Sequence, residues 1–304
     1  MTRASRWNLR VLQKRRSEWY LTVQSFYSAT DPSRKLPSLS SKLVVTTPAD
    51  NPALHQGRVR SSPHVDGRWA CHLYVPVVLE TGEQLGEVLS SAFRSAKTRV
   101  PTLHSIGLDN GRWELHVSLS RPTFLWTHQR EEFKNAVGRV AASCKGWVLS
   151  LTEFITLENE DRSRVFLAVQ VGAGHEQVDL SLSLVPVCVL NICLQLGALT
   201  DALAPALRAI KQSEFYPEPK FHVSIGWALL EGSGIETPNI AGEDEVGKLT
   251  GNFPTIAELP QDMIEELNRD FGSRLRRPSA HVEAEEVCAK IGKDAFRWGL
   301  GPGR

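Results

Sequence analysis

The chain has 304 residues, a formal net charge of +1 and a hydrophobic fraction of 41%. This length is enough for one large domain or two small domains with a buried core. The balanced charge excludes a globally basic surface, so any contact with RNA or phosphate must be local. The five cysteines are scattered and match neither a disulfide framework nor a zinc motif, which favours reduced thiols.

The first 42 residues are basic, with nine lysines and arginines against one glutamate and one aspartate. We interpret residues 1–35 as a disordered basic tail. The run Lys14-Arg15-Arg16 also suits nuclear import, and an arginine-rich, acid-poor start also fits a mitochondrial presequence. No uncharged apolar segment follows the opening charges, so no secretory signal is expected. The turn-rich residues 48–67 are expected to form an extended surface loop.

One order of elements occurs twice in the remaining chain. Apolar residues 69–79 predict a strand, 83–97 have the spacing of an amphipathic helix, and a strand with the sequence HVS follows. Later, residues 164–171 predict a strand and 198–211 a helix, with Thr200 as N-cap and a bend at Pro205. A second HVS strand follows this helix.

Other segments surround the two copies. A further helix is predicted over about 129–144, and a terminal hairpin is predicted around Gly292-Lys293-Asp294. Residues 231–262 read as an acidic, flexible insertion. The duplication predicts a single α+β domain over residues 36–300. Its two pseudo-symmetric lobes would carry antiparallel sheets flanked by helices around a central cleft.

Residues 178–197 fit this order poorly, because they form an apolar run between a strand and the helix expected after it. A strand-like insertion is one interpretation. A membrane span is another, but Asp179, Pro186, Asn191 and Gln195 argue against it. A third hypothesis is intron sequence retained in the gene model, which native tryptic peptides covering residues 184–195 would contradict.

The two HVS strands carry the candidate chemistry. Residues 114–120 read ELHVSLS and residues 221–227 read FHVSIGW. Their alternation places His116 and Ser118 on one strand face, and His222 and Ser224 on one face of the other. The intervening apolar residues are expected to be buried together in each strand: Leu115, Val117 and Leu119 in the first, and Phe221, Val223, Ile225 and Trp227 in the second.

Two such pairs suit in-line displacement at a phosphodiester. One neutral histidine takes a proton from the attacking hydroxyl, and one protonated histidine gives a proton to the leaving oxygen. The serines would donate hydrogen bonds to the phosphate oxygens. Serine nucleophiles fit less well, because no acidic residue is placed to orient either histidine. His-and-Ser pairs are also poor metal ligand sets. The alternative is two ordinary strands with surface histidines.

The approach to the second strand, YPEPK at residues 216–220, adds two candidates. Tyr216 offers a face for stacking a terminal base, although it could equally be a core tyrosine. Lys220 lies two residues before His222 and could contact a phosphate, or could simply be a solvated lysine.

With its paired HxS strands, the chain resembles the 2H phosphoesterase superfamily, and more closely the U6 small nuclear RNA phosphodiesterase family. The narrower resemblance rests on HVSLSRP, FYPEPKFHVSIGW, KLPSLSSKL, NPALHQGRVRSSPHVDGRWACHLYVPV and VCAKIGKDAFRWGL. It spans residues 35–177 and 198–300, and the segment 178–197 departs from it.

The resemblance implies a nuclear, metal-independent 3′→5′ exoribonuclease that trims the uridine-rich 3′ end of U6 RNA. The end would be left as a 2′,3′-cyclic phosphate or a 3′-phosphate, and no cofactor, metal or membrane is implied. The protein is expected to be a monomer. Rivals are another 2H enzyme acting on cyclic nucleotides or tRNA ends, and a non-catalytic RNA-binding module. Catalysis would fall on His116, His222, Ser118 and Ser224, and substrate binding on Tyr216, Val117, Lys220 and Val223.

Overall fold

The structure is a computed structural model that describes residues 55–57, 62, 65–172, 187–232, 253–277 and 280–301. In helix α4 the side chains are described from residue 195 onward. All described residues lie in one compact unit, residues 50–304. The proposed basic tail and most of the predicted loop and acidic insertion lie outside the described residues.

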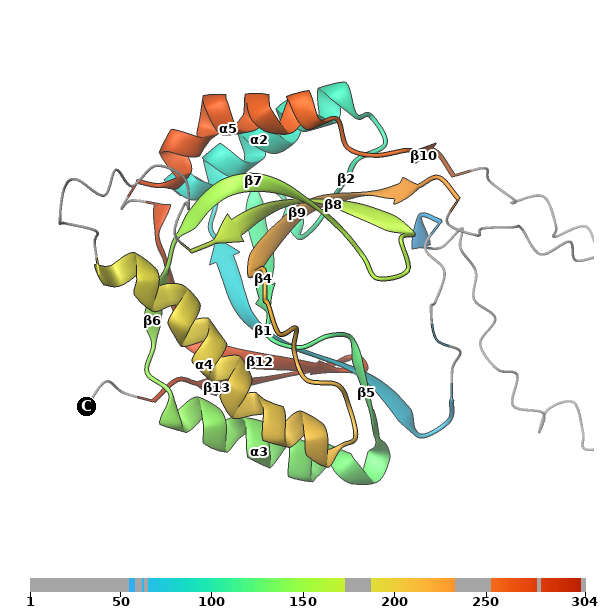
Figure 1. The fold of residues 1–304 in the computed structure, drawn as a ribbon, viewed down its shortest axis with the longest axis vertical. Coiled ribbons are helices and arrows are strands. Elements are labelled where there is room, and N and C mark those ends of the chain that lie inside the picture. Colours follow the sequence, from blue (N-terminus) through green and yellow to red (C-terminus); the bar gives the residue numbers. More distant parts are fainter. Residues whose placement is uncertain are drawn as a thin grey trace, which may run out of the picture. The chain divides into compact units, whose positions relative to one another are not determined.

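A mainly antiparallel sheet of 11 strands forms the centre of this unit, and its main path runs β13-β12-β1-β4-β9-β8-β7 (Figure 1). The long strands are β1 (Arg68–Leu79), β4 (Arg112–Ser118), β7 (Leu151–Glu158), β8 (Arg164–Val171), β9 (His222–Leu230), β12 (Glu286–Ile291) and β13 (Asp294–Gly299). Short strands extend it: β2 (His104–Ser105), β3 (Leu108–Asp109), β5 (Thr123–Trp126) and β10 (Thr255–Ile256). A separate pair joins β6 (Trp147–Leu149) to β11 (Val282–Ala284).

The strand order confirms the duplication expected from the sequence. The two HVS strands, β4 and β9, are antiparallel neighbours at the centre of the path. Each is flanked on its outer side by the strand that precedes it in its own copy, β1 beside β4 and β8 beside β9. The first half is therefore β13-β12-β1-β4 and the second half is β9-β8-β7, and the two copies correspond in the two strands next to the junction.

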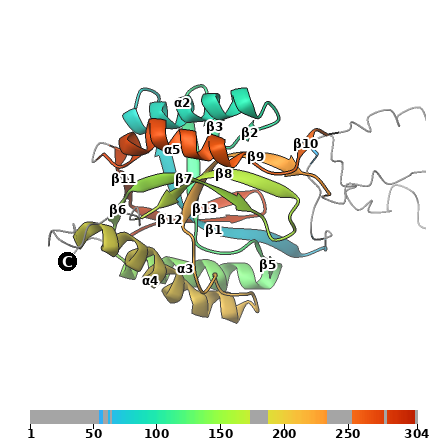
Figure 2. The same cartoon turned by 45° about the horizontal axis from the view of Figure 1, so that its top comes forward.

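One long helix of each copy packs on a helix of the other half of the domain. The long helices are α2 (Gln84–Arg99), α3 (Arg130–Ser143), α4 (Val187–Ala209) and α5 (Gln261–Leu275), with a 3₁₀ turn, η2 (Thr127–Gln129), before α3. Although α2 lies between β1 and β4 in the chain, it packs along α5, which covers β7 of the second half (Figures 1 and 2). Helix α4 comes from the second copy but packs on α3, which lies against β12 and β13 of the first half.

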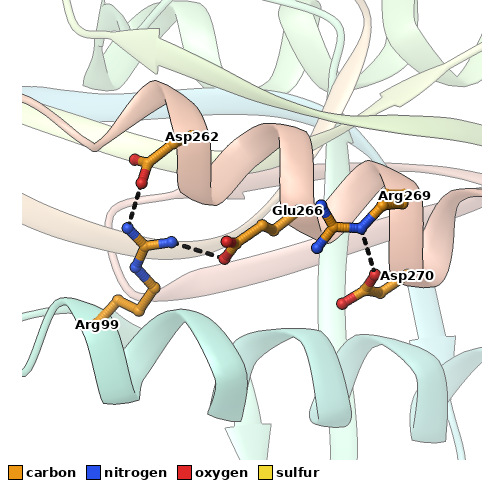
Figure 3. A network of polar contacts seen from close by, with 5 residues as sticks. All are labelled: Arg99, Asp262, Glu266, Arg269 and Asp270. Carbon is orange, nitrogen blue, oxygen red and sulfur yellow. Dashed lines mark hydrogen bonds and ion pairs between the residues drawn. The ribbon is translucent and has the colours of Figure 1, made fainter.

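An ion-pair network joins the first exchanged helix to its neighbour. Arg99, at the end of α2, donates to both Asp262 and Glu266 on α5 (Figure 3). Helix α5 was not expected from the sequence, because its first turn begins inside the stretch read as a flexible insertion. Its apolar residues nevertheless have helical spacing, and those facing the core are Met263, Ile264, Leu267 and Leu275.

Helix α4 corrects the expectations for residues 187–200. It begins at Val187 rather than at residue 198, so the strand-like interpretation is wrong for residues 187–197. Periodicity cannot separate a buried strand from a buried helix in a continuous apolar run. Thr200 does not cap the helix, since its hydroxyl donates to the Gly197 carbonyl at 2.8 Å within the helix. No helix in the described part of the chain is long and apolar enough to cross a bilayer.

The predicted terminal hairpin is confirmed and completes the first half. Strands β12 and β13 pair around a turn at Gly292, which has a positive φ of 64°. A Cβ atom at this glycine would lie 2.7 Å from the Trp69 ring, so the turn needs glycine for its conformation and for its close approach to β1. The turn therefore packs against β1, the strand with which β12 pairs.

Candidate active site

The junction of β4 and β9 brings the four predicted catalytic residues onto one sheet face. Val117 and Val223 are paired across the junction, and both side chains are fully buried. Because side chains alternate along a strand, the residues on either side of each valine project from the opposite face. Those residues are His116, Ser118, His222 and Ser224, and all four are half-buried.

A β-bulge at Ile225 corrects the expected alternation of the second strand. Ser224 pairs with Ala168 and Gly226 with Leu167, so Ile225 is the extra residue. Trp227 is buried, as predicted, but it shares the sheet face of Ser224 and stacks on His104 at 4.7 Å. Bulges of this kind are frequent beside active sites, where they end strict alternation.

His222 has one ring nitrogen fixed by the backbone. Its Nδ1 lies 2.6 Å from the Lys220 carbonyl oxygen. A carbonyl can only accept, so Nδ1 carries the hydrogen and Nε2 is the nitrogen left for proton transfer. Burial lowers the pKa of His222, and the bond to Lys220 partly opposes that shift. Lys220 thus acts on the site through its carbonyl, while its exposed ammonium group contacting phosphate stays a prediction.

His116 lies in a cluster of rings. It makes edge contacts with His72 at 5.0 Å and Tyr74 at 5.4 Å, both on β1. Burial, then the charge of His222, then that of Lys290, lower the pKa of His116 to about 4. Lys290 is exposed on β12 and pairs in register with His72, so it shares their sheet face.

Sequence reasoning missed His72, Tyr74 and Lys290 as members of the site. The signal for the first two was present, because they alternate in the WACHLYVPV run and so share a face. Assigning that face to the HVS residues needed the pairing of β1 with β4, in which Tyr74 lies opposite Ser118. Lys290 needed the pairing of β12 with β1, which joins residues more than 200 positions apart.

The buried histidines predict a pH dependence of stability. Burial, then the charges of His116 and Lys290, lower the pKa of His72 to about 3. Below pH 6.5 the unfolded chain therefore binds a proton at this position that the folded chain does not, so stability falls as the pH falls towards 3. By pH 5 the loss from His72 is about 2 kcal/mol.

We expect the His72→Gln variant to lose less stability than the wild-type protein between pH 7 and pH 5. Urea unfolding at several pH values measures the difference, with His128→Gln, a change at an exposed histidine, as the control that should follow the wild-type curve. Parallel curves for His72→Gln and wild type would contradict the burial of a neutral imidazole.

Tyr216 is 37% exposed, and its ring meets that of Phe215 at 5.2 Å with an interplanar angle of 65°. Its hydroxyl donates to Glu160 at 2.8 Å, and the guanidinium of Arg121 lies over its ring at 4.0 Å. Arg121 also pairs with Glu160, at 3.3 Å. A stacked base would therefore use the ring face that Arg121 leaves open. Arg121 follows the first HVS strand and was not singled out from the sequence.

Val117 and Val223, the other two residues predicted to contact substrate, are buried. The side chains of Val117 and Val223 are 0% exposed, so only their backbone could meet a substrate. Their role in substrate binding stays a prediction. Among the residues that the structure describes, no three His, Cys, Asp or Glu side chains are grouped to hold a metal ion.

The chain is similar to a described protein family and to several named proteins. A family model described as "HVSL: Uncharacterised conserved protein" matches residues 32–298. The mouse protein U6 snRNA phosphodiesterase 1 is 28% identical over 210 residues, 66% of this chain and 68% of that protein. The bovine protein of the same name is 29% identical over 182 residues, 60% of this chain and 59% of that protein. The match therefore spans only about three fifths to two thirds of these relatives.

Among solved structures, Kluyveromyces marxianus Usb1 with uridine monophosphate aligns with a TM-score of 0.49 and 18% identity. The alignment covers 76% of this chain and 98% of that chain.

Proposed function

Because the chain belongs to the HVSL family, we propose that it is an RNA phosphodiesterase that trims the uridine-rich 3′ end of U6 small nuclear RNA. The observation that carries the proposal is the meeting of His116, Ser118, His222 and Ser224 on one face at the β4–β9 junction. The names of the mouse and bovine relatives support the choice of RNA.

The geometry suits cleavage by the neighbouring 2′-hydroxyl of the RNA. One histidine, neutral, takes the proton of the 2′-hydroxyl, and O2′ forms a bond to phosphorus. The bond from phosphorus to the O5′ of the terminal nucleoside breaks, and the second histidine, protonated, gives its proton to that oxygen. Ser118 and Ser224 donate to the non-bridging oxygens as charge develops there. The products are a released nucleoside and an RNA ending in a 2′,3′-cyclic phosphate, which water can open to a 3′-phosphate.

The remaining expectations belong to the same proposal. The terminal base stacks on the open face of Tyr216, and Lys220 meets a phosphate of the bound strand. The protein acts in the nucleus, where a U6 processing enzyme finds its RNA, and it acts as a monomer. Residues 36–300 form the catalytic domain, and residues 1–35 are a basic tail outside it.

A 5′-labelled oligoribonucleotide ending in a uridine run tests the proposal. In the presence of EDTA we expect a ladder of products shortened from the 3′ end. A 2′-deoxy sugar at the penultimate nucleotide should stop the first cleavage, because it removes the attacking hydroxyl. The matched control carries the 2′-deoxy sugar at the terminal nucleotide, whose 2′ position takes no part, and should lose its last nucleotide normally.

Three other results of this assay would contradict the proposed function or its mechanism. Cleavage of 2′,3′-cyclic mononucleotides without any trimming would identify a different 2H enzyme. RNA binding without cleavage of either substrate would identify a non-catalytic module. Equal trimming of both deoxy-substituted strands would contradict the attack by the 2′-hydroxyl.

A further inference from the structure

The two serines of the site have different surroundings. On the first half, the Nε2 atom of His72 lies 3.1 Å from the Ser118 hydroxyl oxygen. His72 is on β1, two residues from Tyr74, which is the direct partner of Ser118. On the second half, the direct partner of Ser224 is Ala168, which has no side-chain donor or acceptor. The position on β8 that corresponds to His72, two residues before Ala168, is Phe166, whose side chain has no hydrogen-bond donor, so the histidine beside Ser118 has no counterpart beside Ser224.

His72 packs against two neighbouring rings in this position. Its ring stacks on Tyr74 with a centroid distance of 5.4 Å and an interplanar angle of 18°. It also meets the His116 ring, with a centroid distance of 5.0 Å and an interplanar angle of 76°. Because its pKa is lowered to about 3, the ring is neutral near pH 7 and has one N–H donor and one acceptor nitrogen.

We propose that His72 is a positioning residue that orients the Ser118 hydroxyl toward the phosphate. This inference rests on the proposed function. When Nε2–H of His72 donates to the Ser118 oxygen, the hydroxyl hydrogen is left free to point at a phosphate oxygen. Without His72 the hydroxyl can rotate to other acceptors, and part of its binding to the transition state is lost.

The charge of the phosphate determines whether His72 Nε2 or the Ser118 hydroxyl is the donor in this hydrogen bond. A neutral imidazole can either donate or accept at Nε2, according to its tautomer. If Nε2 accepted, the Ser118 hydrogen would point away from the substrate and only oxygen lone pairs would face an anionic phosphate. That arrangement repels the substrate, so an anionic ligand favours the tautomer with hydrogen on Nε2.

The test is a double-mutant cycle between His72→Ala and Ser118→Ala, measured as kcat for 3′ trimming. We expect His72→Ala to lower kcat by roughly three- to tenfold, as for loss of one hydrogen bond. In the Ser118→Ala background the same change should cost nothing further, because there is no hydroxyl left to orient. The His72→Gln variant keeps a side-chain N–H donor and should recover most of the loss.

A purely structural role makes a different prediction. It would multiply the two losses in the double variant, and it would leave His72→Gln as impaired as His72→Ala. Either result, with melting temperatures close to wild type, overturns the proposal. These outcomes require active wild-type protein, so an inactive wild type counts against the proposed function rather than against the role of His72.

A second readout keeps the role of His72 testable without RNA cleavage. The same four proteins are titrated with inorganic phosphate. We expect His72→Ala to weaken phosphate binding when Ser118 is present and to leave it unchanged when Ser118 is alanine. Equal weakening in both backgrounds contradicts the proposal whatever the natural substrate is.

Discussion

Alanine at His116 or at His222 will each lower kcat for 3′ trimming by about 10²- to 10⁴-fold, the range for loss of a general acid or base. The proton from the attacking hydroxyl and the proton to the leaving oxygen move in one displacement, so both histidines are needed for the same step. The double variant should therefore be little slower than the slower single variant. Single-turnover trimming of the labelled oligonucleotide measures all three.

The matched control is His128→Ala. His128 is exposed in η2, outside the β4–β9 junction, and its removal should leave kcat unchanged. Comparable melting temperatures for all variants exclude unfolding as the cause of any loss. Full activity in either His116→Ala or His222→Ala would contradict the two-histidine mechanism. If the fold-loss in kcat of the double variant equals the product of the two single losses, the histidines act in separate steps.

Trp113→Ala should lower the free energy of unfolding by about 3–5 kcal/mol, the usual cost of removing a buried aromatic ring. Trp113 is fully buried on β4, on the face opposite to His116. Its indole N–H donates to the Gly86 carbonyl at 3.2 Å and to the Ser90 hydroxyl at 3.0 Å, both on α2. The substitution thus leaves a cavity and two acceptors without their donor, on the buried face of the strand that carries His116.

Two further variants separate packing from hydrogen bonding. Trp113→Phe keeps most of the ring and loses the donor, so it should cost only about 1–3 kcal/mol. Trp126→Ala removes an indole that is 44% exposed and should cost far less than Trp113→Ala. Urea unfolding at pH 7 compares the three, and equal losses for Trp113→Ala and Trp126→Ala would contradict the central place of Trp113 in the core.

The local pattern of the sequence predicted the elements that carry the site. The alternation around His116 and His222 predicted two strands with paired polar residues, and the repeated order of elements predicted two lobes whose polar faces meet at one cleft. That the two strands pair directly within one sheet was not predicted. The predicted ranges 69–79, 83–97, 129–144 and 164–171 correspond to β1, α2, α3 and β8. These are cases in which hydrophobic spacing alone determines both the type and the buried face of an element.

What could not be predicted depends on contacts across the fold. The bulge at Ile225 arises from the pairing of β9 with β8, which local alternation does not encode. His72 belongs to the site because β1 pairs with β4, and Arg121 belongs to it because its side chain lies over the ring of Tyr216. Neither contact can be read from the local sequence. The apolar run before residue 198 fits a strand and a helix equally well, and its position in the fold decides for the helix.

The exchange of helices between the halves has a consequence for how the site assembles. Helix α2 of the first copy packs on α5 and contacts β9 of the second half, and helix α4 of the second copy packs on α3 of the first, so the helices of each copy depend on the other copy for their packing. Strands β12 and β13, which complete the first half, follow every other described element in the chain, yet β12 pairs with β1. Folding thus depends on long-range contacts that form late. The two histidines lie on strands of different copies, so they come together only when β4 of the first copy pairs with β9 of the second.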